Sequence, residues 1–594
     1  GWSELFGEGE ENMIKKLAGC IREYKAAAIL TPITVTFEVI LEVIIPMLMA
    51  VLIDRGINRG SLPDILKTGA LLVGCCVVSL LCGALSGGFC AKAGAGFAKN
   101  LRHDMFYRVQ DYSFANIDKF SASSIITRMT TDVTNVQNAF QMIIRIAVRC
   151  PAMLIFALVM AFSVNAELAL VFLVTTPILG IGLFIMMKSA FPVFNRVFKK
   201  YDNLNRIVQE NLRGIRVVKA FVREDHETAK FKDASEDIYR EFTLAERILA
   251  FNGPLMQLAV YGSILLISWF GASLIIKGQG AEGAMTTGQL TSMISYASQI
   301  LMSLMMVSMV LVMITISRAS AERIVEVLDE ESTIKSPADP VTEVRDGSVS
   351  FKNVSFSYAG RKGTACLSDV SLDIASGQTV GIIGGTGSSK TTLVQLIPRL
   401  YDVTGGTLSV GGCDVRDYDI KTLRDSVAMV LQKNELFSGT IKDNLRWGNE
   451  NATDEELVAA CRLAQADSFI RDFPDGYDTY IEQGGTNVSG GQKQRLCIAR
   501  AILKKPKILI LDDSTSAVDT ATDAAIRRAF AEDIPDTTKI IIAQRISSVQ
   551  HADQIIVLDG GRVSDVGTHD ELVARSEIYR EVYESQTKGG GDDE

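Results

Sequence analysis

Residues 379–392 read TVGIIGGTGSSKTT and set the fold class of the second half of the chain. The apolar run TVGII predicts a buried strand, and the sequence from Thr391 onward predicts a helix. The turn between them matches G-x-x-x-x-G-K-[ST], except that Ser389 replaces the last glycine. Such a turn binds phosphate, because backbone N–H groups and the start of the helix face the anion. The loop comprises Gly384, Gly385, Thr386, Gly387, Ser388, Ser389, Lys390, Thr391 and Thr392.

Two side chains of this loop have expected roles at a nucleotide. Lys390 is expected to reach the β- and γ-phosphates, and the Thr391 hydroxyl is expected to ligate Mg²⁺. The Cβ of Ser389 is expected to narrow the loop without preventing binding, because glycine is the residue that permits close backbone approach.

A second strand signal ends in a carboxylate. Residues 508–512 read ILILD, and Asp512 is expected to hold Mg²⁺ directly or through water, in a Walker B arrangement. The sequence therefore predicts an α/β P-loop domain with a mainly parallel sheet at 347–585, followed by a flexible tail at 586–594. Other short runs that predict strands lie at 349–358, 370–374 and 539–544.

The segment VSGGQKQR at 488–495 precedes the Walker B strand. A serine and two glycines that open a helix can present a hydroxyl, backbone N–H groups and the helix dipole to a γ-phosphate. This segment resembles the signature motif of ATP-binding cassette (ABC) proteins. In that family the signature completes the nucleotide site of a second domain, so the resemblance implies a dimer of nucleotide domains. The signature residues here are Val488, Ser489, Gly490, Gly491 and Gln492.

Further positions resemble the same family. Tyr358 resembles the aromatic residue that stacks on adenine, and Glu482 resembles the acidic X-loop residue of exporters. Gln432 resembles the Q-loop glutamine, which with Thr391 and Asp512 forms the implied Mg²⁺ set. The residues that resemble the D-loop are Ser516, Ala517, Val518 and Asp519.

The first half of the chain is apolar enough to cross a membrane several times. Hydrophobic residues make up 47% of 594, the formal net charge is −9 and the mean hydropathy is +0.21. These values exclude a disordered chain and argue against nucleic acid as a partner. Six stretches reach the roughly 20 residues that a spanning helix needs. They lie near 26–53, 66–91, 142–166, 167–188, 248–276 and 286–317.

Loop charge predicts the orientation. The long loops Lys92–Asn138 and Lys188–Arg247 are rich in Lys and Arg, so these loops and the N-terminus are expected in the cytoplasm. Both loops contain helical patterns, so we expect the membrane helices to extend into the cytoplasm and return. The ten cysteines show no C-x-x-C spacing and are expected to be reduced thiols. Residues 1–12 are acidic, unlike a signal peptide, and are expected to be a non-native leader.

Six spans, two long loops and one cassette in this order resemble an ABC exporter half-transporter. The resemblance implies a multidomain membrane protein with a six-helix all-α transmembrane domain at 13–325 and a linker at 326–346. It also implies ATP and Mg²⁺ as cofactors. A multi-pass location in a bacterial inner or plasma membrane is expected from the minimal domain set. Residues 111–133 and 210–224 resemble the two coupling regions, which transmit cassette closure to the spans.

Two positions depart from the cassette pattern at one site. The glutamate that acts as general base in the family is replaced by Asp513, whose carboxylate is one methylene shorter. The switch histidine is replaced by Gln544, which can hydrogen-bond a γ-phosphate but cannot carry a proton. Together the replacements resemble the degenerate site of heterodimeric exporters, in which a second half-transporter carries the catalytic Glu and the switch His. A homodimer is the alternative.

Two sets of side chains are candidates for a cargo cavity. Glu38 and Glu42 lie mid-span at i and i+4, so they share one helix face. They either attract a cationic amphiphile or, in the favoured interpretation, pair with a polar or basic group on a neighbouring helix. Arg145 and Arg149 are expected to anchor the third span at the membrane interface. The second set is a stripe of flexible methionines on the sixth span: Met302, Met305, Met306, Met309 and Met313.

These features favour ATP-driven export of hydrophobic or amphipathic compounds of the multidrug, lipid or peptide type. Some proteins with this fold import siderophores or other small molecules, so import is one alternative. A regulatory nucleotide-binding subunit is a second alternative, which the degenerate site motivates. An ATPase that is only tethered to the membrane is a third, and the coupling segments argue against it.

Overall fold

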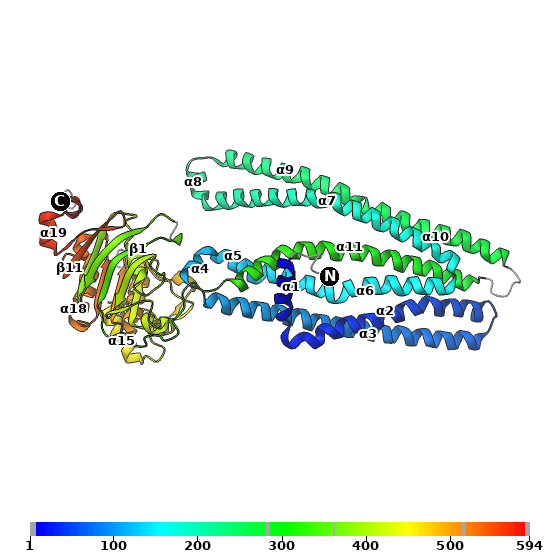
Figure 1. Ribbon diagram of the computed structural model, residues 1–594, viewed down its shortest axis with the longest axis horizontal. Helices are drawn as coiled ribbons and strands as arrows, with labels where there is room; N and C mark the ends of the chain where they lie inside the picture. The colour runs from blue at the N-terminus through cyan, green and yellow to red at the C-terminus, as the bar shows by residue number, and fades with distance from the viewer. Residues whose placement is uncertain (1–7, 279–284, 361–362, 514–517, 589–594) are drawn as a thin grey trace. The chain divides into compact units, whose positions relative to one another are not determined.

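The computed structural model describes residues 8–278, 285–360, 363–513 and 518–588 (Figure 1). These residues form two compact units. The helical unit contains the residues up to 110 together with 122–330, and the sheet unit contains residues 111–121 together with those from 331 onward.

The helical unit contains six helical segments that are long and apolar enough to cross a membrane, by length and composition, among the described residues. α3 alone has 49 residues, which is about 74 Å of helix at ~1.5 Å per residue, against a hydrocarbon core of about 30 Å. The prediction that the spans continue as long helical extensions is therefore confirmed. The helices are α1 (Glu8–Gly19), η2 (Arg22–Tyr24), α2 (Lys25–Val51), η3 (Leu52–Ile57), α3 (Leu62–Gln110), α5 (Ala122–Thr127), η4 (Arg128–Asp132), α6 (Val133–Val164), α7 (Ala166–Arg213), α8 (Ile215–Ala220), α9 (Glu224–Ala250), α10 (Asn252–Lys277) and α11 (Thr287–Asp329).

The helices of this unit pack in two groups. α2, α3, α6 and α11 pack against one another, and α7 runs beside α9 and α10 (Figure 1); α10 also packs on α11, and α7 on α6, which joins the two groups. Val35, Val39 and Val43 recur at i, i+4 and i+8 on α2 and lie fully buried in the core. The hydroxyl of the buried Tyr296 on α11 donates to the Val43 carbonyl oxygen at 3.0 Å, which ties α11 to α2.

Three expected boundaries differ from the structure. α11 continues to Asp329, four residues beyond the expected end of the transmembrane domain at 325. α1 begins at Glu8, so part of the expected leader belongs to a helix. Asn165 has an extended backbone and its side chain accepts a hydrogen bond from the Leu168 N–H at 3.0 Å, so α7 already begins at Ala166.

The sheet unit has two main sheets. One is an antiparallel sheet of order β2-β1-β4-β5, and the other has six strands in the order β12-β11-β3-β10-β9-β6, in which all neighbours except β12 and β11 run parallel. The predicted α/β domain with a mainly parallel sheet is confirmed. The strands are β1 (Val349–Phe356), β2 (Leu367–Ile374), β3 (Thr379–Gly384), β4 (Gly405–Val410), β5 (Cys413–Asp414), β6 (Val427–Val430), β7 (Gly439–Thr440), β8 (Tyr480–Ile481), β9 (Ile508–Asp512), β10 (Thr538–Ile542), β11 (Gln554–Asp559) and β12 (Arg562–Gly567).

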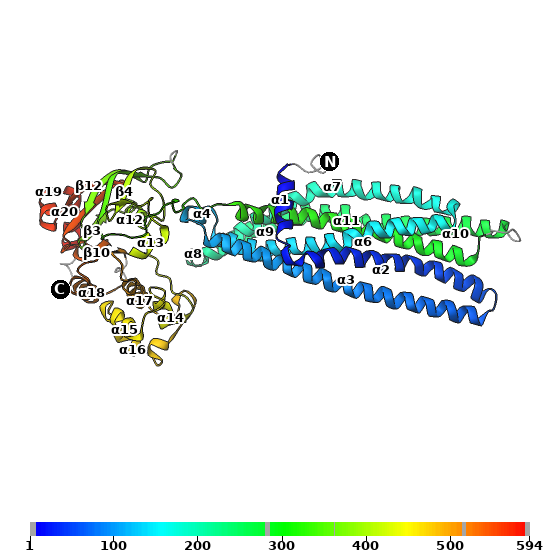
Figure 2. The ribbon, with the colours of Figure 1, turned by 60° about the horizontal axis from the view of Figure 1, so that its bottom comes forward.

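Helices α12 and α18 follow strands of the parallel sheet, and α14 to α17 form a helical part of the same unit (Figure 2). The last helix, α20, ends at Lys588, so the flexible tail expected from residue 586 is wrong for its first three residues. The helices are α4 (Phe114–Lys119), α12 (Lys390–Leu396), α13 (Ile420–Ser426), α14 (Ile441–Arg446), α15 (Asp454–Leu463), α16 (Asp467–Arg471), η6 (Gly476–Asp478), η7 (Gln483–Gly485), α17 (Gly490–Leu503), α18 (Thr520–Asp533), η8 (Ile546–Ser548), α19 (His569–Arg575) and α20 (Glu577–Lys588).

The strand order determines where the loops that carry the predicted nucleotide-binding residues lie. β10 lies between β3 and β9, and Ile542 pairs with Ile382 on one side and with Asp512 on the other. Parallel strands end at the same edge of a sheet, so the loops that follow β3, β10 and β9 meet there.

The short helix α4 belongs to the sheet unit, although it comes from the first expected coupling region. Ser113 and Asn116 form a capping box at its start, and the Asn116 amide donates to the Glu331 carbonyl oxygen at 2.9 Å. At its end, the Tyr401 hydroxyl donates to Asp118 Oδ2 at 2.6 Å. Nothing in the sequence around Tyr401 singled it out as the residue that fixes this helix.

Candidate nucleotide-binding site

Lys390 folds back onto the phosphate loop that contains it. Lys390 Nζ donates to the carbonyl oxygens of Gly384 and Gly385, both at 2.8 Å, and approaches Ser388 Oγ at 3.3 Å. A Cβ built on Gly385 or Gly387 would meet no atom within 4 Å, so the face of the loop that they form is open. Partial burial lowers the pKa of Lys390. The loop thus offers backbone N–H groups and a cation at one open face, as a polyphosphate requires.

Ser389 occupies a left-handed backbone conformation, with φ +69° and ψ 27° at the N-cap of α12. Glycine adopts this conformation freely, whereas an L side chain costs about 1–2 kcal/mol there. The loop keeps its bend with serine in place of glycine. The backbone of Ser389 is therefore strained.

Thr391 and Asp512 meet across the strand ends. The Thr391 hydroxyl donates to Asp512 Oδ1 at 3.1 Å, and Asp512 is buried at the end of β9. Burial raises the pKa of Asp512, and the hydrogen bond from Thr391 opposes that rise. A hydroxyl and a carboxylate beside a phosphate loop are hard oxygen ligands of the kind that Mg²⁺ shares with nucleotide phosphates, so these residues fit that ion.

The two departures from the family pattern contact each other. Gln544 Nε2 donates to Asp513 Oδ2 at 2.6 Å, and Asp513 is itself in a left-handed conformation with φ +49°. Burial raises the pKa of Asp513, while hydrogen bonds from Gln432 and Gln544 lower it. Gln432 therefore lies at the same carboxylate, as its position in the Q-loop resemblance implies.

Tyr358 lies beside the start of α12. Its hydroxyl is 3.0 Å from Thr392 Oγ1, and its ring is half exposed. The ring of Tyr401 meets it edge-on at 5.2 Å between centroids, and Phe356 does so at 4.9 Å. These contacts fix the orientation of the Tyr358 ring near the phosphate loop. Part of the ring surface stays exposed and is available for stacking.

The signature segment opens α17 as expected. Ser489 is the N-cap, with its Oγ accepting from the Gln492 N–H and its own N–H donating to Gln492 Oε1. Ser489 and Gly490 are exposed, Gly491 is the second residue of the helix and Val488 packs partly against the core. α17 packs on α14, α15 and β6.

Other predicted residues are placed as follows. Glu482 Oε2 accepts from the Thr486 hydroxyl at 2.8 Å, which orders the turn before the signature. In the expected D-loop, Val518 is buried and Asp519 caps α18 by accepting from the Thr522 N–H at 2.9 Å. Ser516 and Ala517 lie outside the described residues.

In the helical unit, both mid-span glutamates pair with one arginine. Arg149 Nη1 donates to Glu38 Oε1 at 2.6 Å, and Nη2 donates to Glu42 Oε2 at 2.5 Å. The Ser86 hydroxyl lies 3.5 Å from Glu38 Oε2. The favoured interpretation, a basic partner on a neighbouring helix, matches this geometry. The interpretation of Arg149 as an interface anchor is wrong, because its guanidinium is occupied by two carboxylates of α2.

The methionine stripe borders the same region. Gln299 Nε2 lies 3.5 Å from the Glu42 carbonyl oxygen, so this face of α11 adjoins α2 at Glu42. Met302 and Met306 follow Gln299 at i+3 and i+7 and therefore continue that face. Of the five methionines, Met302, Met305, Met306 and Met309 are 54%, 37%, 40% and 65% exposed, and Met313 is half-buried. Within this chain four of these side chains are therefore more than one-third exposed.

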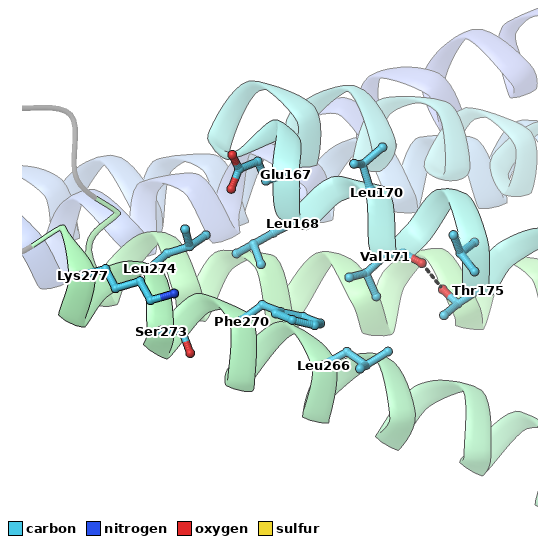
Figure 3. Close-up of a pocket in the computed structure, with 11 residues that line it drawn as sticks. Glu167, Leu168, Leu170, Val171, Thr175, Leu266, Phe270, Ser273, Leu274 and Lys277 are labelled. Atoms are coloured by element: carbon cyan, nitrogen blue, oxygen red, sulfur yellow. Dashed lines mark hydrogen bonds between the residues drawn. The ribbon is translucent and has the colours of Figure 1, made fainter.

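A separate hollow lies between α7 and α10 (Figure 3). Its cavity volume is about 460 Å³, and Leu168, Val171 and Phe270 give it an apolar wall with Glu167 and Lys277 in its lining. None of the predicted cargo residues lines this hollow.

Comparison with known proteins agrees with this geometry. Residues 28–304 match the model of the ABC transporter transmembrane region, and residues 367–516 match the ABC transporter model. The chain is 37% identical to the Bacillus subtilis ABC transporter ATP-binding protein YfiB, over 96% of this chain and 98% of that protein. This chain belongs to the ABC transporter family. An ABC transporter ATP-binding protein of Mycobacterium bovis, Mb1304c, is 36% identical over 96% of this chain and 97% of its own length.

Membership of the ABC transporter family confirms the predicted combination of a transmembrane region and an ATP-binding domain. This ABC half-transporter is a multi-pass membrane protein in which a transmembrane region and an ATP-binding domain of the ATPase type are fused in one chain. The loops after β3, β10 and β9, which carry the residues predicted to bind nucleotide, lie together at one edge of the sheet of that domain.

We predict that Ser389→Gly stabilises the nucleotide-free protein, because glycine relieves a left-handed conformation that costs about 1 kcal/mol or more. Chemical unfolding of the full chain in lipid nanodiscs measures the change. The control is Thr386→Gly in the same loop, where φ is not positive and glycine only adds freedom to the unfolded chain. A Ser389→Gly variant no more stable than the parent would contradict the assignment of strain.

Proposed function

We propose that this chain is one half of a heterodimeric exporter that moves hydrophobic or amphipathic compounds across a membrane at the expense of ATP. Its own nucleotide site binds ATP but turns it over slowly or not at all. Its signature motif completes the hydrolytic site of a partner half-transporter that carries the catalytic Glu and the switch His. The observation that carries this proposal is the hydrogen bond between Gln544 and Asp513.

That contact is expected to weaken Asp513 as a general base. A general base must lie within hydrogen-bond reach of the attacking water with a free lone pair, and one oxygen of Asp513 already accepts from Gln544. Its carboxylate is also one methylene shorter than glutamate. Gln544 can donate to a γ-phosphate, but it cannot take or carry a proton. The pair therefore supports binding over hydrolysis.

The signature supports a partner chain. Ser489 and Gly490 are exposed at the start of α17, and the start of a helix favours an anion. The segment of α8 and the turn after it supplies a second argument, because Val217, Phe221 and Val222 are 60%, 73% and 81% exposed. In the family the second coupling region docks in the partner's cassette, and such exposed apolar side chains suit that role. A homodimer would need both sites to hydrolyse with Asp513 and Gln544.

In the proposed cycle, ATP draws the two cassettes together and turns the cavity outward, and hydrolysis at the partner's site resets it. At this chain's site, Lys390 and the loop N–H groups hold the phosphates while Tyr358 stacks on the base. Mg²⁺, when bound by Thr391, Asp512 and Gln432, neutralises phosphate charge. The proposed orientation keeps the N-terminus and the nucleotide domain in the cytoplasm of a bacterial cell, and the relatives named above are bacterial.

The cargo path is proposed to follow the face shared by α2 and α11. Glu38, Glu42 and Arg149 have a formal sum of one negative charge, and Glu42 is 37% exposed. The open methionines beside it are flexible and polarisable, so they accommodate varied apolar groups. This combination favours an amphiphile with a cationic head, moved outward.

The first prediction concerns the chain alone. Purified into lipid nanodiscs, it should bind ATP yet hydrolyse it no faster than Lys390→Ala, because Asp513 and Gln544 cannot activate water. Phosphate release and nucleotide binding are measured on the same samples. Brisk turnover above that control would mean a working homodimer and would sink the degenerate-site proposal.

A second prediction compares the two sites in the assembled pair. Ser489→Ala should lower the ATPase rate by about 10-fold or more, because it removes a hydroxyl aimed at the partner's γ-phosphate. Asp513→Asn should change that rate less than about twofold. Equal loss from both variants would show that this chain's own carboxylate takes part in turnover.

A third prediction tests the cargo path by dye uptake into inside-out vesicles. Glu42→Gln should raise the apparent KM for a lipophilic cation by about threefold to tenfold, since about 1 kcal/mol of attraction is lost. The apparent KM for a neutral amphiphile should change little. The control is Leu265→Ala, an exposed residue on α10. If Glu42→Gln affects both dyes alike, the carboxylate does not recognise charge.

A further inference from the structure

The end of α20 contacts the segment that carries Gln544. The side-chain amide of Gln586 makes two hydrogen bonds to this backbone: Nε2 donates to the Gln544 carbonyl oxygen at 2.8 Å, and Oε1 accepts from the Ile546 N–H at 2.9 Å. One amide therefore satisfies an acceptor and a donor on either side of Arg545, where the chain is extended. A neighbouring strand would make the same pair of bonds.

The helix that carries Gln586, α20, is anchored in the core of the domain. Tyr579 on α20 is fully buried in the domain core, and its hydroxyl lies 2.8 Å from His569 Nδ1. Tyr583 packs partly against the same core, and its ring meets His569 at 5.1 Å. Tyr579, Tyr583 and Gln586 recur at i, i+4 and i+7, so they share the face of α20 that is turned toward the core.

We call the two hydrogen bonds between Gln586 and residues 544 and 546 the clamp. Gln544 connects this clamp to the nucleotide site. The backbone carbonyl of Gln544 is held by Gln586, and the side chain of Gln544 donates to Asp513 at 2.6 Å. Movement of the segment would break both contacts together. A side-chain amide carries two N–H bonds, so Gln544 can keep one on Asp513 and direct the other to a phosphate.

We propose that Gln586 is a positioning residue for the nucleotide site: by clamping residues 544–546 from the last helix, it presets Gln544 to meet the γ-phosphate of ATP. The inference rests on the proposed role of Gln544 at that phosphate. ADP lacks the γ-phosphate, so the clamp selects ATP over ADP. The last helix thus contributes to nucleotide retention without touching the nucleotide.

The test is the ratio of the Kd for Mg-ADP to the Kd for Mg-ATP, measured on the full chain in lipid nanodiscs. Gln586→Met has similar length but cannot hydrogen-bond, and it should lower this ratio about threefold to tenfold while leaving ADP binding unchanged. The matched control is the neighbouring Thr587→Ala, whose lost hydroxyl bonds carbonyls of its own helix. Thr587→Ala should leave the ratio unchanged.

Two further variants separate the clamp from the role of Gln544. Gln544→Ala should lower the ratio at least as much, and the double variant should behave like Gln544→Ala alone, because Gln586 acts through Gln544. If Gln544→Ala leaves the ratio unchanged, the proposed role of Gln544 fails and the clamp fails with it. If Gln544→Ala lowers the ratio but Gln586→Met does not, or weakens ATP and ADP alike, only the clamp is overturned. Additive losses in the double variant would also overturn it.

Discussion

The parallel pairing of β10 with β3 and β9 is the constraint on which the nucleotide site depends. β10 is fully buried between them, and Ile542 at its end is in register with Ile382 and Asp512. This register places three loops side by side. The hydrogen bonds from Thr391 to Asp512 and from Gln544 to Asp513 both follow from it.

Two residues of these loops are strained, and both depart from the family pattern. Ser389 and Asp513 have positive φ values of 69° and 49°, each directly after a strand end or the tight turn that follows one. Left-handed backbone in a residue other than glycine costs about 1–2 kcal/mol, and such strain persists where the surrounding structure holds it in place. For Asp513, the N–H donates to the Ile542 carbonyl oxygen at 3.1 Å, and the carboxylate accepts from Gln544. The packing of the sheet thus maintains the geometry of the site.

The sequence could predict what local pattern encodes. The phosphate loop, the Walker B strand and the N-cap at Ser489 depend on residues that are close in the chain, and the structure has each of them in place. The strand order and the contact between Asp513 and Gln544 depend on pairing across many residues, which no local pattern specifies. Arg149 was misassigned for the same reason, because only helix packing reveals that α2 brings two carboxylates to it. The sequence predicts a tail at Gln586, since the role of this residue arises from a contact with residues about forty positions away.

In the proposed function, the hydrogen bond between Gln544 and Asp513 accounts for both slow ATP hydrolysis and strong ATP retention at this site. A carboxylate that accepts two amide hydrogen bonds has fewer free lone pairs for water, so the bonds from Gln432 and Gln544 reduce its capacity as a base. The same bond fixes the orientation of the Gln544 amide, which lowers the entropy lost when its second N–H meets a phosphate. A histidine at this position could donate a proton or carry charge, whereas the glutamine offers only a fixed dipole. The geometry therefore suits a site that holds ATP through successive cycles while turnover proceeds at the other composite site.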